Sequence, residues 1–477
     1  MNILILGAGR VGRSIAKSLS SQSYDVCVVD LDNEKLKDLQ EDYDLAITCG
    51  HGSHPKTLKR AGVNESSILL AGTNDDEVNL IACQLSKSLF GVKKTICRLS
   101  DSSYINSLNS FGKNAIDIAI SPELEVTQHI IDLINHPGAE QIESFANGLV
   151  KLVSVKAKKD GRLVNRELKS IKSDIPNTNM FIPTIFRKGK ALIPEGSTVI
   201  KENDEVYFLS SEKNIDKIVS EMREQDSSSS RIMIIGGGRI GLALALHLEK
   251  SYKVKLIEVS HAQCESLSKE LDKSIVLHGN GSDEELLKSE NIENIDVFCA
   301  LTNDDETNIM SAFLAKKLGA KKTLITLNRY SYINILPKSF VDLAVSPQRL
   351  TVSMVLQHLS SADLPQEVLL KMMSGVEALE GVIHENKCTK DLFGESYLDL
   401  PLPENTVLGA IVRNNIIMTP DDNLTVEKND HLILFINGKT DKEQIEKLFE
   451  PSFVNIILWL RYRFLNYENN INITPLK

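Results

Sequence analysis

The sequence predicts an α/β protein made of two doubly wound parallel-sheet domains, each followed by a small α+β lobe. Three observations support this fold class. Short apolar, β-branched runs alternate with helical patterns, which is typical of βαβ units in a parallel sheet. A glycine-rich loop, Gly7-x-Gly9-x-x-Gly12, follows the first apolar run and opens a helix. The same arrangement returns later, with Gly241 standing 229 residues after Gly12.

A second segment repeats at the same spacing. Residues 71–80 return as residues 300–309, and seven of the ten positions are identical. A shorter segment, residues 103–106, returns as residues 331–334. A period of this length exceeds the roughly 20–50 residues of solenoid repeats, so we interpret the chain as two copies of a domain pair.

In the first domain, the pattern predicts six strands that alternate with helices. The expected strands cover residues 3–6, 26–30, 45–48, 68–71, 95–99 and 116–120. Helices are expected near residues 10–20, 33–41, 54–61, 78–90 and 102–111. Ser121 and Pro122 predict one further helix that ends near residue 135, because Ser favours the N-cap position and Pro the first helical position.

Residues 140–220 show a different pattern, typical of a small α+β lobe. Strand-like runs are separated by turn signals such as Lys188-Gly189, and one short helix follows them. The expected strands are 149–156, 181–187, 198–200 and 205–210, and the expected helix is 213–222. The predicted division is a first parallel-sheet domain at 1–135, its lobe at 136–226, a second domain at 231–362, its lobe at 363–450, and a tail at 451–477. Residues 227–230, all serine, indicate a linker.

Composition excludes several classes of protein. The net charge of −10 argues against a dedicated nucleic-acid binder, which needs clustered Lys and Arg. No apolar run approaches the roughly 20 residues that span a bilayer, so we do not expect a channel or transporter pore. The start lacks the basic region of a signal peptide. The seven cysteines include no CxxC pair, which argues against a disulfide framework or a cysteine zinc site and favours the cytoplasm.

The glycine loop predicts a nucleotide site of the Rossmann type. Its first glycine allows a tight turn, its second lets the backbone approach a pyrophosphate, and its third lets helix and strand pack closely. Asp30 closes the second strand, 18 residues after Gly12, and Glu258 closes the equivalent strand of the second copy. A carboxylate there accepts both ribose hydroxyls and repels a 2′-phosphate. The ligand should therefore be NAD(H) or an adenine nucleotide rather than NADP.

Three further loops follow strands of the predicted sheet, where ligands bind. The loop that begins at Gly50-His51 would face an adenine edge, with metal binding by His51 and His54 as the alternative. In the loop at residues 73–77 we expect contact with the ligand, capping of the next helix, or both, with one residue capping and its neighbours facing the ligand. Arg98 closes the fifth strand and would reach phosphates, or would be a surface arginine. The second copy has Thr326 in its place.

Catalytic groups are not evident in the sequence. A dehydrogenase needs a general acid or base beside the cofactor, but no YxxxK pair is present. No GxxxxGK[ST] loop is present either, which argues against a P-loop ATPase. Two nucleotide domains without visible chemistry indicate a sensor. A soluble NAD-dependent oxidoreductase is the alternative.

Together, these motifs resemble the RCK (KTN) family of nucleotide-binding domains. The resemblance rests on Gly-Ala-Gly-Arg-Val-Gly with Asp30, on the Gly-His-Gly-Ser-His loop, and on the repeated Thr-Asn-Asp-Asp-Glu segment. Over about residues 1–450, the order of domains is similar to that of the tandem-RCK regulatory subunits of bacterial Trk potassium-uptake systems. The resemblance implies N-type domains at 1–135 and 231–362, and C-type lobes at 136–226 and 363–450.

The resemblance also implies the ligand-binding residues. In the first copy they are Gly7, Gly9, Gly12, Asp30, Thr73 and Arg98, and in the second copy Gly236, Gly238, Gly241, Glu258 and Thr302. Other candidates in the same loops are Ala8, Arg10, Val11, Gly50, His51, Asn74 and Asp75, with Arg239, Gly279, Asn280 and Asn303 in the second copy. From Arg98 we expect the first site to take ATP as well as NADH, and the second site to favour NAD(H) or ADP.

The resemblance further implies a regulatory role and not an enzyme. It implies that NAD(H), with ATP and ADP as alternative ligands, controls a separate membrane subunit of the TrkH or TrkG type. It also implies a ring, which we expect to be a homotetramer, on the inner face of the plasma membrane. A regulator of another cation channel or antiporter is the alternative. The tail departs from the family and would be an extension, a shifted reading frame or a membrane-surface helix beside Trp459.

Overall fold

We describe the protein from a computed structural model. The structure describes residues 2–449 apart from 21–23, 64–67, 108–115, 171–174, 176–177, 179, 224–229, 330–331, 333–335, 338, 360–365, 370–375, 386–388, 421–422 and 438–441. The chain divides into two compact units. The first contains Met1–Pro137 and Asp226–Leu359, and the remaining described residues make up the second.

The first parallel-sheet domain is a six-stranded sheet in the order β3-β2-β1-β4-β5-β6, with all neighbours parallel. The order reverses between β1 and β4, so the predicted doubly wound arrangement is confirmed. The strands are β1 (Asn2–Leu6), β2 (Asp25–Asp30), β3 (Ala46–Cys49), β4 (Ile68–Ala71), β5 (Lys94–Arg98) and β6 (Ile118–Ile120). The helices are α1 (Arg10–Ser20), α2 (Asn33–Asp42), α3 (Pro55–Arg60), α4 (Asp76–Phe90), α5 (Ser102–Ser107) and α6 (Pro122–Asn135).

The central strands β1 and β4 are almost entirely apolar because helices cover both faces of the sheet. In β1, Ile3 and Ile5 belong to one buried cluster, while Leu4 and Leu6 belong to the cluster on the opposite face. This alternation follows from the period of two residues in a strand. The sheet core therefore lies between two helical layers and holds the carboxyl ends of the strands in a fixed arrangement.

The second parallel-sheet domain repeats this topology in the order β14-β13-β12-β15-β16-β17. Its strands are β12 (Arg231–Ile235), β13 (Lys253–Glu258), β14 (Ile275–His278), β15 (Val297–Ala300), β16 (Lys322–Thr326) and β17 (Leu343–Val345). Its helices are α9 (Arg239–Leu248), α10 (His261–Glu270), α11 (Glu284–Ser289), α12 (Asp305–Lys317) and α14 (Pro347–Leu359). The duplication expected from the sequence is confirmed at the level of topology.

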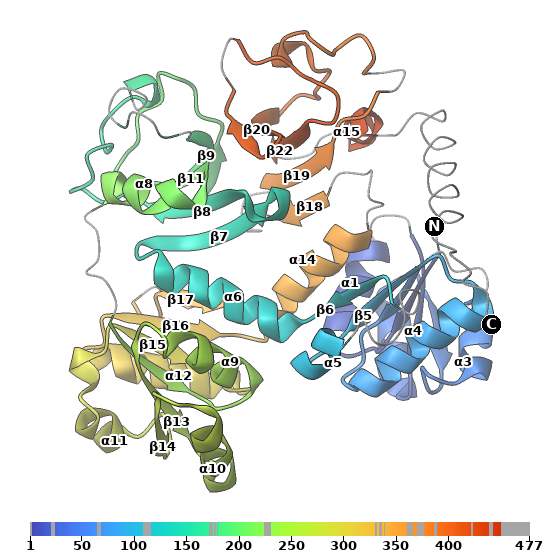
Figure 1. Cartoon of the computed structure of the whole chain (residues 1–477), viewed down its shortest axis with the longest axis vertical. Coiled ribbons are helices and arrows are strands. Elements are labelled where there is room, and N and C mark those ends of the chain that lie inside the picture. Colours follow the sequence, from blue (N-terminus) through green and yellow to red (C-terminus); the bar gives the residue numbers. More distant parts are fainter. Residues whose placement is uncertain are drawn as a thin grey trace, which may run out of the picture. The chain divides into compact units, whose positions relative to one another are not determined.

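Within this first unit, the two domains exchange their last helices. Helix α6 of the first domain packs against α9 of the second, and α14 of the second packs against α1 of the first (Figure 1). Val355 of α14 is fully buried in a core cluster that otherwise belongs to the first domain. Tyr252 of the second domain donates a 2.9 Å hydrogen bond to Asn135 at the end of α6. Each domain therefore uses a helix of the other to cover its apolar surface.

The second unit contains two antiparallel sheets. The first sheet has the order β10-β9-β11-β8-β7, and the second has the order β18-β19-β22-β20-β21. The elements of the first lobe are β7 (Ala139–Phe145), β8 (Val150–Lys156), β9 (Phe181–Arg187), β10 (Lys190–Leu192), β11 (Glu205–Ser210) and α8 (Ile215–Met222). Those of the second lobe are β18 (Gln366–Leu369), β19 (Val376–Val382), β20 (Thr406–Arg413), β21 (Ile416–Met418), β22 (His431–Asn437) and α15 (Lys442–Phe449). Short 3-10 helices in these lobes cover Ala146–Gly148, Leu168–Ser170, Glu212–Asn214 and Tyr397–Asp399, and a further one, Ile292–Asn294, lies in the second parallel-sheet domain.

A buried ion pair recurs in the two lobes. Arg187 donates to both carboxylate oxygens of Asp204, at 2.9 and 2.7 Å, and Arg413 does the same to Asp430, at 2.7 Å to each oxygen. The bidentate geometry matches the planar fork of a guanidinium. The two pairs occupy equivalent places, and each joins a strand to a loop within its own lobe.

Several predicted elements differ from those observed. Helix α4 begins at Asp76 and not at Val78, because Asp75 caps it. Residues 198–200 form no strand, and Val199 makes only an isolated bridge to Glu167. Strand β6 begins at Ile118, because the side chain of Asp117 accepts hydrogen bonds from Thr95. Strands β7 and β10 were not predicted. The predicted helix 102–111 ends at Ser107, and its remainder, the serine linker and the tail lie outside the described residues.

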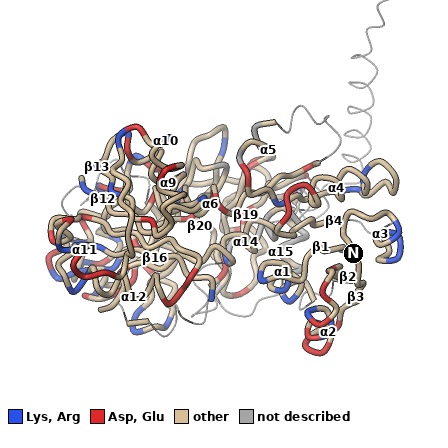
Figure 2. The backbone as a smooth tube through the Cα atoms, turned by 90° about the horizontal axis from the view of Figure 1, so that it is seen from below, with Lys and Arg blue, Asp and Glu red and all other residues tan. Residues whose placement is uncertain are grey.

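Charge is distributed along several surface helices without separation by sign. Figure 2 shows acidic and basic residues interspersed along α2 and α11. Among the helices that the structure describes, none has both the length and the apolar character needed to cross a bilayer.

Candidate functional site

The glycine loop after β1 has the backbone that its sequence requires. Gly7 has φ +103°, a conformation that side chains rarely adopt. A Cβ on Gly12 would lie 1.8 Å from the carbonyl oxygen of Gly7, so only glycine lets α1 approach the strand this closely. A Cβ on Gly9 would meet nothing within 4 Å. Gly9 therefore faces open space at the N-terminus of α1, where unpaired N–H groups attract phosphate.

The second glycine loop has the same geometry. Gly236 has φ +98°, a Cβ on Gly241 would lie 1.9 Å from the carbonyl oxygen of Gly236, and a Cβ on Gly238 would meet nothing within 4 Å. The described part of the chain therefore contains two glycine loops of equivalent geometry.

The predicted ribose acids contact these loops directly. Asp30 accepts hydrogen bonds from the backbone N–H of Ala8 at 2.6 Å and of Asp32 at 2.8 Å. Glu258 accepts the equivalent bonds from Gly237 at 2.7 Å and Ser260 at 2.8 Å. A carboxylate has about four lone-pair positions, so each acid keeps capacity for hydroxyl donors.

An exposed apolar residue follows each acid, and sequence reasoning missed both. Leu31 is 67% exposed, and its counterpart Val259 is 71% exposed. Their equivalent position in the two copies was the signal that could have identified them. They offer an apolar surface beside the ribose acids.

The loop after β3 lies against Asp30 through its backbone. The N–H of Gly50 donates 2.9 Å to the carbonyl oxygen of Asp30, and Gly279 makes the same bond to Glu258. The rings of His51 and His54 stack with their centroids 4.7 Å apart. Among the described residues, no group of three or more His, Cys, Asp or Glu side chains could hold a metal ion.

The repeated Thr-Asn-Asp-Asp-Glu loop braces two strand ends. Asp75 caps α4 by accepting from Val78 at 2.8 Å. The buried Asp76 accepts from the backbone N–H groups of Ser100 and Asp101, at 2.9 Å in each case. The second copy shows the same arrangement, with Asp304 as cap and Asp305 accepting from the residues after β16. The capping interpretation is therefore confirmed for Asp75.

A buried asparagine completes this brace. Asn79 accepts from the N–H of Thr73 at 3.0 Å and from its hydroxyl at 2.7 Å, and donates 3.0 Å to the carbonyl oxygen of Arg98. Asn308 makes the equivalent bonds to Thr302 and Thr326. Sequence reasoning missed both asparagines. Asn79 thereby fixes the end of β5, and with it the backbone of Arg98, while Asn308 fixes the end of β16.

Arg98 does not lie on the open surface. Its side chain is 15% exposed and forms an ion pair with Glu123, 3.3 Å from Nη2 to Oε1. Its other terminal nitrogen donates 3.3 Å to the side chain of Asn74. The alternative of a surface arginine was therefore wrong. Glu123 was not predicted, although the Ser-Pro pair that precedes it was recognised as a helix start.

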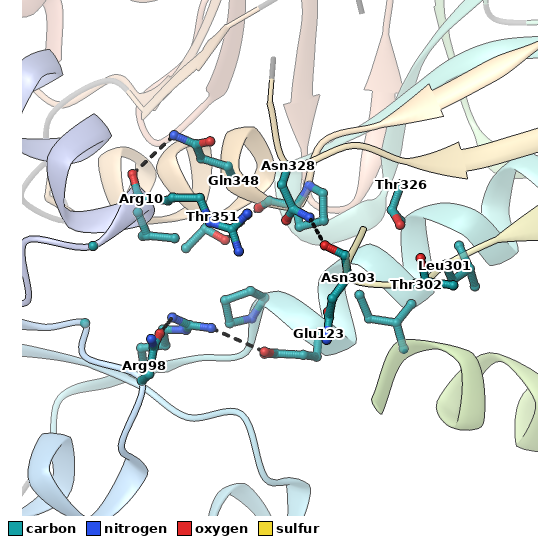
Figure 3. A pocket seen from close by; sticks show the side chains of 17 residues that line it. Arg10, Arg98, Glu123, Leu301, Thr302, Asn303, Thr326, Asn328, Gln348 and Thr351 are labelled. Atoms are coloured by element: carbon teal, nitrogen blue, oxygen red, sulfur yellow. Dashed lines mark hydrogen bonds and ion pairs between the residues drawn. The ribbon is translucent and has the colours of Figure 1, made fainter. Parts of the chain in front are cut away.

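A cleft lies where the two domains of the first unit meet (Figure 3). Its volume of about 220 Å³ is below the roughly 300–1,000 Å³ typical of pockets for whole drug-sized ligands, so it suits a terminal group better than a complete nucleotide. Gln348 spans the cleft and donates 3.2 Å to the carbonyl oxygen of Arg10. The first domain contributes Gly9, Arg10, Val11, Gly72, Asn74, Arg98, Pro122 and Glu123, and the second contributes Ile240, Leu301, Thr302, Asn303, Thr326, Asn328, Pro347, Gln348 and Thr351.

The structure thus brings together part of the predicted set. Gly9, Arg10, Val11, Asn74 and Arg98 share this cleft with Thr302 and Asn303 of the other domain. Asp30, Gly50 and His51 lie at the neighbouring strand ends of their own domain, as do Glu258, Gly279 and Asn280 of theirs, and none of them lines the cleft. The remaining candidates belong to the surrounding loops, namely Gly7, Ala8, Thr73, Asp75, Gly236 and Gly238, or to the first turns of α1 and α9, namely Gly12, Arg239 and Gly241.

Comparison with known proteins identifies the same two repeats. The model of the TrkA-N domain matches residues 3–122 and 232–347, and that of the TrkA-C domain matches residues 152–223. The Trk system potassium uptake protein TrkA of Halomonas elongata is 40% identical, over 94% of this chain and 99% of the relative. The proteins of the same name from Vibrio alginolyticus and Haemophilus influenzae are 40% and 38% identical, each over 95% of this chain and 99% of the relative.

Solved structures share the fold. The GsuK RCK domain superposes with a TM-score of 0.61 at 17% identity, covering 93% of each chain. The GsuK channel bound to NAD superposes with a TM-score of 0.62 at 17% identity, covering 94% of this chain and 78% of that chain. By fold, repeated motifs and near full-length similarity, the chain belongs to the TrkA family of Trk system potassium uptake proteins.

Proposed function

We propose that this protein is a nucleotide-binding regulatory subunit that controls potassium uptake through a separate Trk membrane subunit. The observation that carries the proposal is the cleft, where the glycine loop of the first domain and the strand ends of the second meet in one chain. The family relatives, named as potassium uptake proteins, supply the process that is controlled.

The ligands we propose are NAD(H), with ATP and ADP as alternatives. The pyrophosphate lies on the glycine loops, and the ribose donates to Asp30 or Glu258. Leu31 and Val259 offer apolar contacts beside the ribose. The loop at Gly50-His51 faces the adenine, and the loop at residues 73–77 faces the ligand beside the cleft. In the first copy, a third phosphate extends from Gly9 into the cleft towards Arg98. The NAD-bound state of the structurally similar GsuK channel supports this choice of ligand class.

Regulation proceeds through the exchanged helices. Helices α6 and α14 both begin at the cleft, since Pro122, Glu123, Pro347 and Gln348 line it. A ligand that binds there with different affinity in two arrangements of the domains shifts the equilibrium between them. Coupling free energies of roughly 1–3 kcal/mol are typical of such linkage.

A regulator without catalysis is favoured by the composition of the cleft. Among the described residues that line it, the titratable ones are Arg10, Arg98 and Glu123, and none is His, Lys, Tyr or Cys. Glu123 is paired with Arg98 and is therefore poorly suited to act as a general base.

The partner we propose is a potassium-transporting membrane subunit of the TrkH or TrkG type. Self-association into a ring, a homotetramer, would place several cleft sites around one partner. The protein would then be peripheral on the cytoplasmic face of the plasma membrane.

Two experiments test the proposal. Calorimetric titration of the full chain with NADH, NAD, ATP and ADP should show binding of at least one dinucleotide and one mononucleotide. Potassium uptake in cells that lack the endogenous regulator should require both this chain and the membrane subunit, and should respond to the bound nucleotide. Transport by this chain alone in liposomes, or turnover of NADH with carbonyl substrates, would contradict the proposal.

A further inference from the structure

The two copies contribute very different charges to the cleft. The charged residues that line it in the described part of the chain, Arg10, Arg98 and Glu123, all come from the first domain. The second domain contributes only neutral side chains there, including Thr326 and Gln348. These two neutral residues occupy the positions of Arg98 and Glu123, because Thr326 closes β16 and Gln348 follows the Ser-Pro start of α14. The arginine and the glutamate are therefore present together in one copy and replaced together in the other.

The Arg98–Glu123 pair is incomplete. Only one oxygen of Glu123 contacts the guanidinium, at 3.3 Å, which is longer than the roughly 2.7–2.9 Å of a strong charged hydrogen bond. Nε of Arg98 and Oε2 of Glu123 are shielded from solvent, and no described residue offers either a hydrogen bond. A bidentate contact would use both atoms. The pair thus leaves hydrogen-bonding capacity unused on both partners.

Glu123 has a second source of stabilisation that does not depend on Arg98. It lies in the first turn of α6, which Ser121 caps by accepting from Leu124 at 3.4 Å. Negative charge is favoured at the N-terminus of a helix. The carboxylate can therefore stay in the cleft when another anion takes the guanidinium.

We propose that Glu123 is an internal competitor of the terminal phosphate for Arg98, and so sets how strongly the first site distinguishes ATP from ADP. This inference rests on the proposed function. In the ligand-free protein, Glu123 supplies the negative charge that Arg98 faces. A γ-phosphate that enters the cleft must share or displace that contact and is repelled by the carboxylate. The shorter ADP ends before this position and does not compete.

The test is a set of variants titrated with ATP and with ADP by calorimetry on the full chain, first in EDTA and then with Mg²⁺. Glu123→Gln keeps the shape of the side chain and introduces the residue that the second copy already carries. It should tighten ATP binding about ten-fold, which corresponds to roughly 1.4 kcal/mol, and ADP binding less than three-fold, with or without Mg²⁺. Glu125→Gln removes the same charge from the same helical turn outside the cleft, and should change neither affinity more than about two-fold.

A double-variant cycle distinguishes competition from a structural effect. With Arg98→Ala already present, Glu123→Gln should change the ratio of ATP to ADP affinity much less, because the competition for the guanidinium is gone and only the direct repulsion of the γ-phosphate remains. Equal or weaker ATP binding in Glu123→Gln would overturn the inference. ATP binding that weakens only with Mg²⁺ would also overturn it, because Glu123 would then hold the cation. If the unaltered protein binds neither nucleotide, the proposed function itself fails, which is a separate outcome.

Discussion

The carboxylate of Asp30 accepts a 2.6 Å hydrogen bond from the backbone N–H of Ala8, in the middle of the glycine loop. A residue that we assign to the ribose therefore also supports the loop that we assign to the pyrophosphate. The two halves of the nucleotide site are coupled before any ligand binds. Glu258 and Gly237 repeat this contact in the second domain at 2.7 Å.

Asp30→Ala should weaken nucleotide binding at the first site by roughly 1.5–3 kcal/mol, because charged hydrogen bonds to the ribose are lost. It should also lower the thermal stability of the first domain, because Ala8 and Asp32 lose their acceptor. Calorimetry with NADH and thermal unfolding measure the two effects. Glu258→Ala is the matched control and should affect only the second site. Unchanged NADH affinity in Asp30→Ala would refute the ribose assignment.

Two glycines of one loop should respond differently to the same substitution. In Gly12→Ala, the added Cβ would lie 1.8 Å from the oxygen of Gly7, so α1 must move away and the domain should lose roughly 1–3 kcal/mol of stability or more. In Gly9→Ala, the Cβ meets nothing within 4 Å, so stability should be retained while the bound phosphates are obstructed. Urea unfolding measures the loss of stability in Gly12→Ala, and ATP titration measures the loss of binding in Gly9→Ala. The assignment of Gly9 to the ligand is contradicted if Gly9→Ala binds nucleotides normally.

Arg98→Ala should weaken ATP at the first site much more than ADP or NADH, since only ATP places a third phosphate near the guanidinium. The second site should be unaffected, because Thr326 already stands in the equivalent place. Arg13→Ala removes a charge from α1 outside the cleft and serves as the control. Equal losses for all three ligands, or no loss, would count against a role for Arg98 in binding the γ-phosphate.

Acid stability should depend on Asp296. Burial alone would raise the pKa of Asp296, but the ion pair with Lys321 and hydrogen bonds from Ser230 and Arg231 outweigh it and lower the pKa to about 2. Because this pKa lies below the ordinary value of 3.8, the stabilisation is present above pH 4 and is lost as the pH falls towards 2. Asp296→Asn should therefore lower the free energy of unfolding of the second domain at pH 7. It should also make that free energy depend less on pH between pH 4 and 2.

Urea unfolding at several pH values between 7 and 2 measures this effect. Asp272→Asn, at an exposed acid of the same domain, is the control. If Asp296→Asn loses as much stability between pH 4 and 2 as the unaltered protein does, the assignment of this loss to Asp296 is contradicted.

The sequence predicted most of what depends on local patterns. The buried strands of the first sheet were found because their central residues are apolar, and the second sheet because the motifs of the first repeat, while each glycine of the loops has its own steric reason. The edge strand β10 was missed because it has three residues, and β7 because its polar residues hide the alternation. The predicted strand at 198–200 is an isolated bridge at Val199, which local propensity cannot distinguish from a ladder.

The cleft could not be predicted from such patterns. Its geometry depends on contacts between residues more than 200 positions apart, such as Gln348 with Arg10, and these leave no periodic signal. Arg98 was singled out because it stands at a strand end. Its partner Glu123 lies 25 residues further along the chain. The start of its helix was recognised, but the sequence does not show that this helix points Glu123 towards the end of β5.

The exchange of α6 and α14 has a consequence for the origin of the two sites. A chain with one copy alone would leave the surface covered by the exchanged helix open, and would need a second identical chain to cover it. In such a pair, both sites would carry the same residues, because one sequence encodes both chains. When the two copies are joined in one polypeptide, each copy is encoded separately and the two sites can differ. Arg98 and Glu123 can persist on one side while Thr326 and Gln348 stand on the other, and a symmetric pair becomes an asymmetric sensor within one gene product.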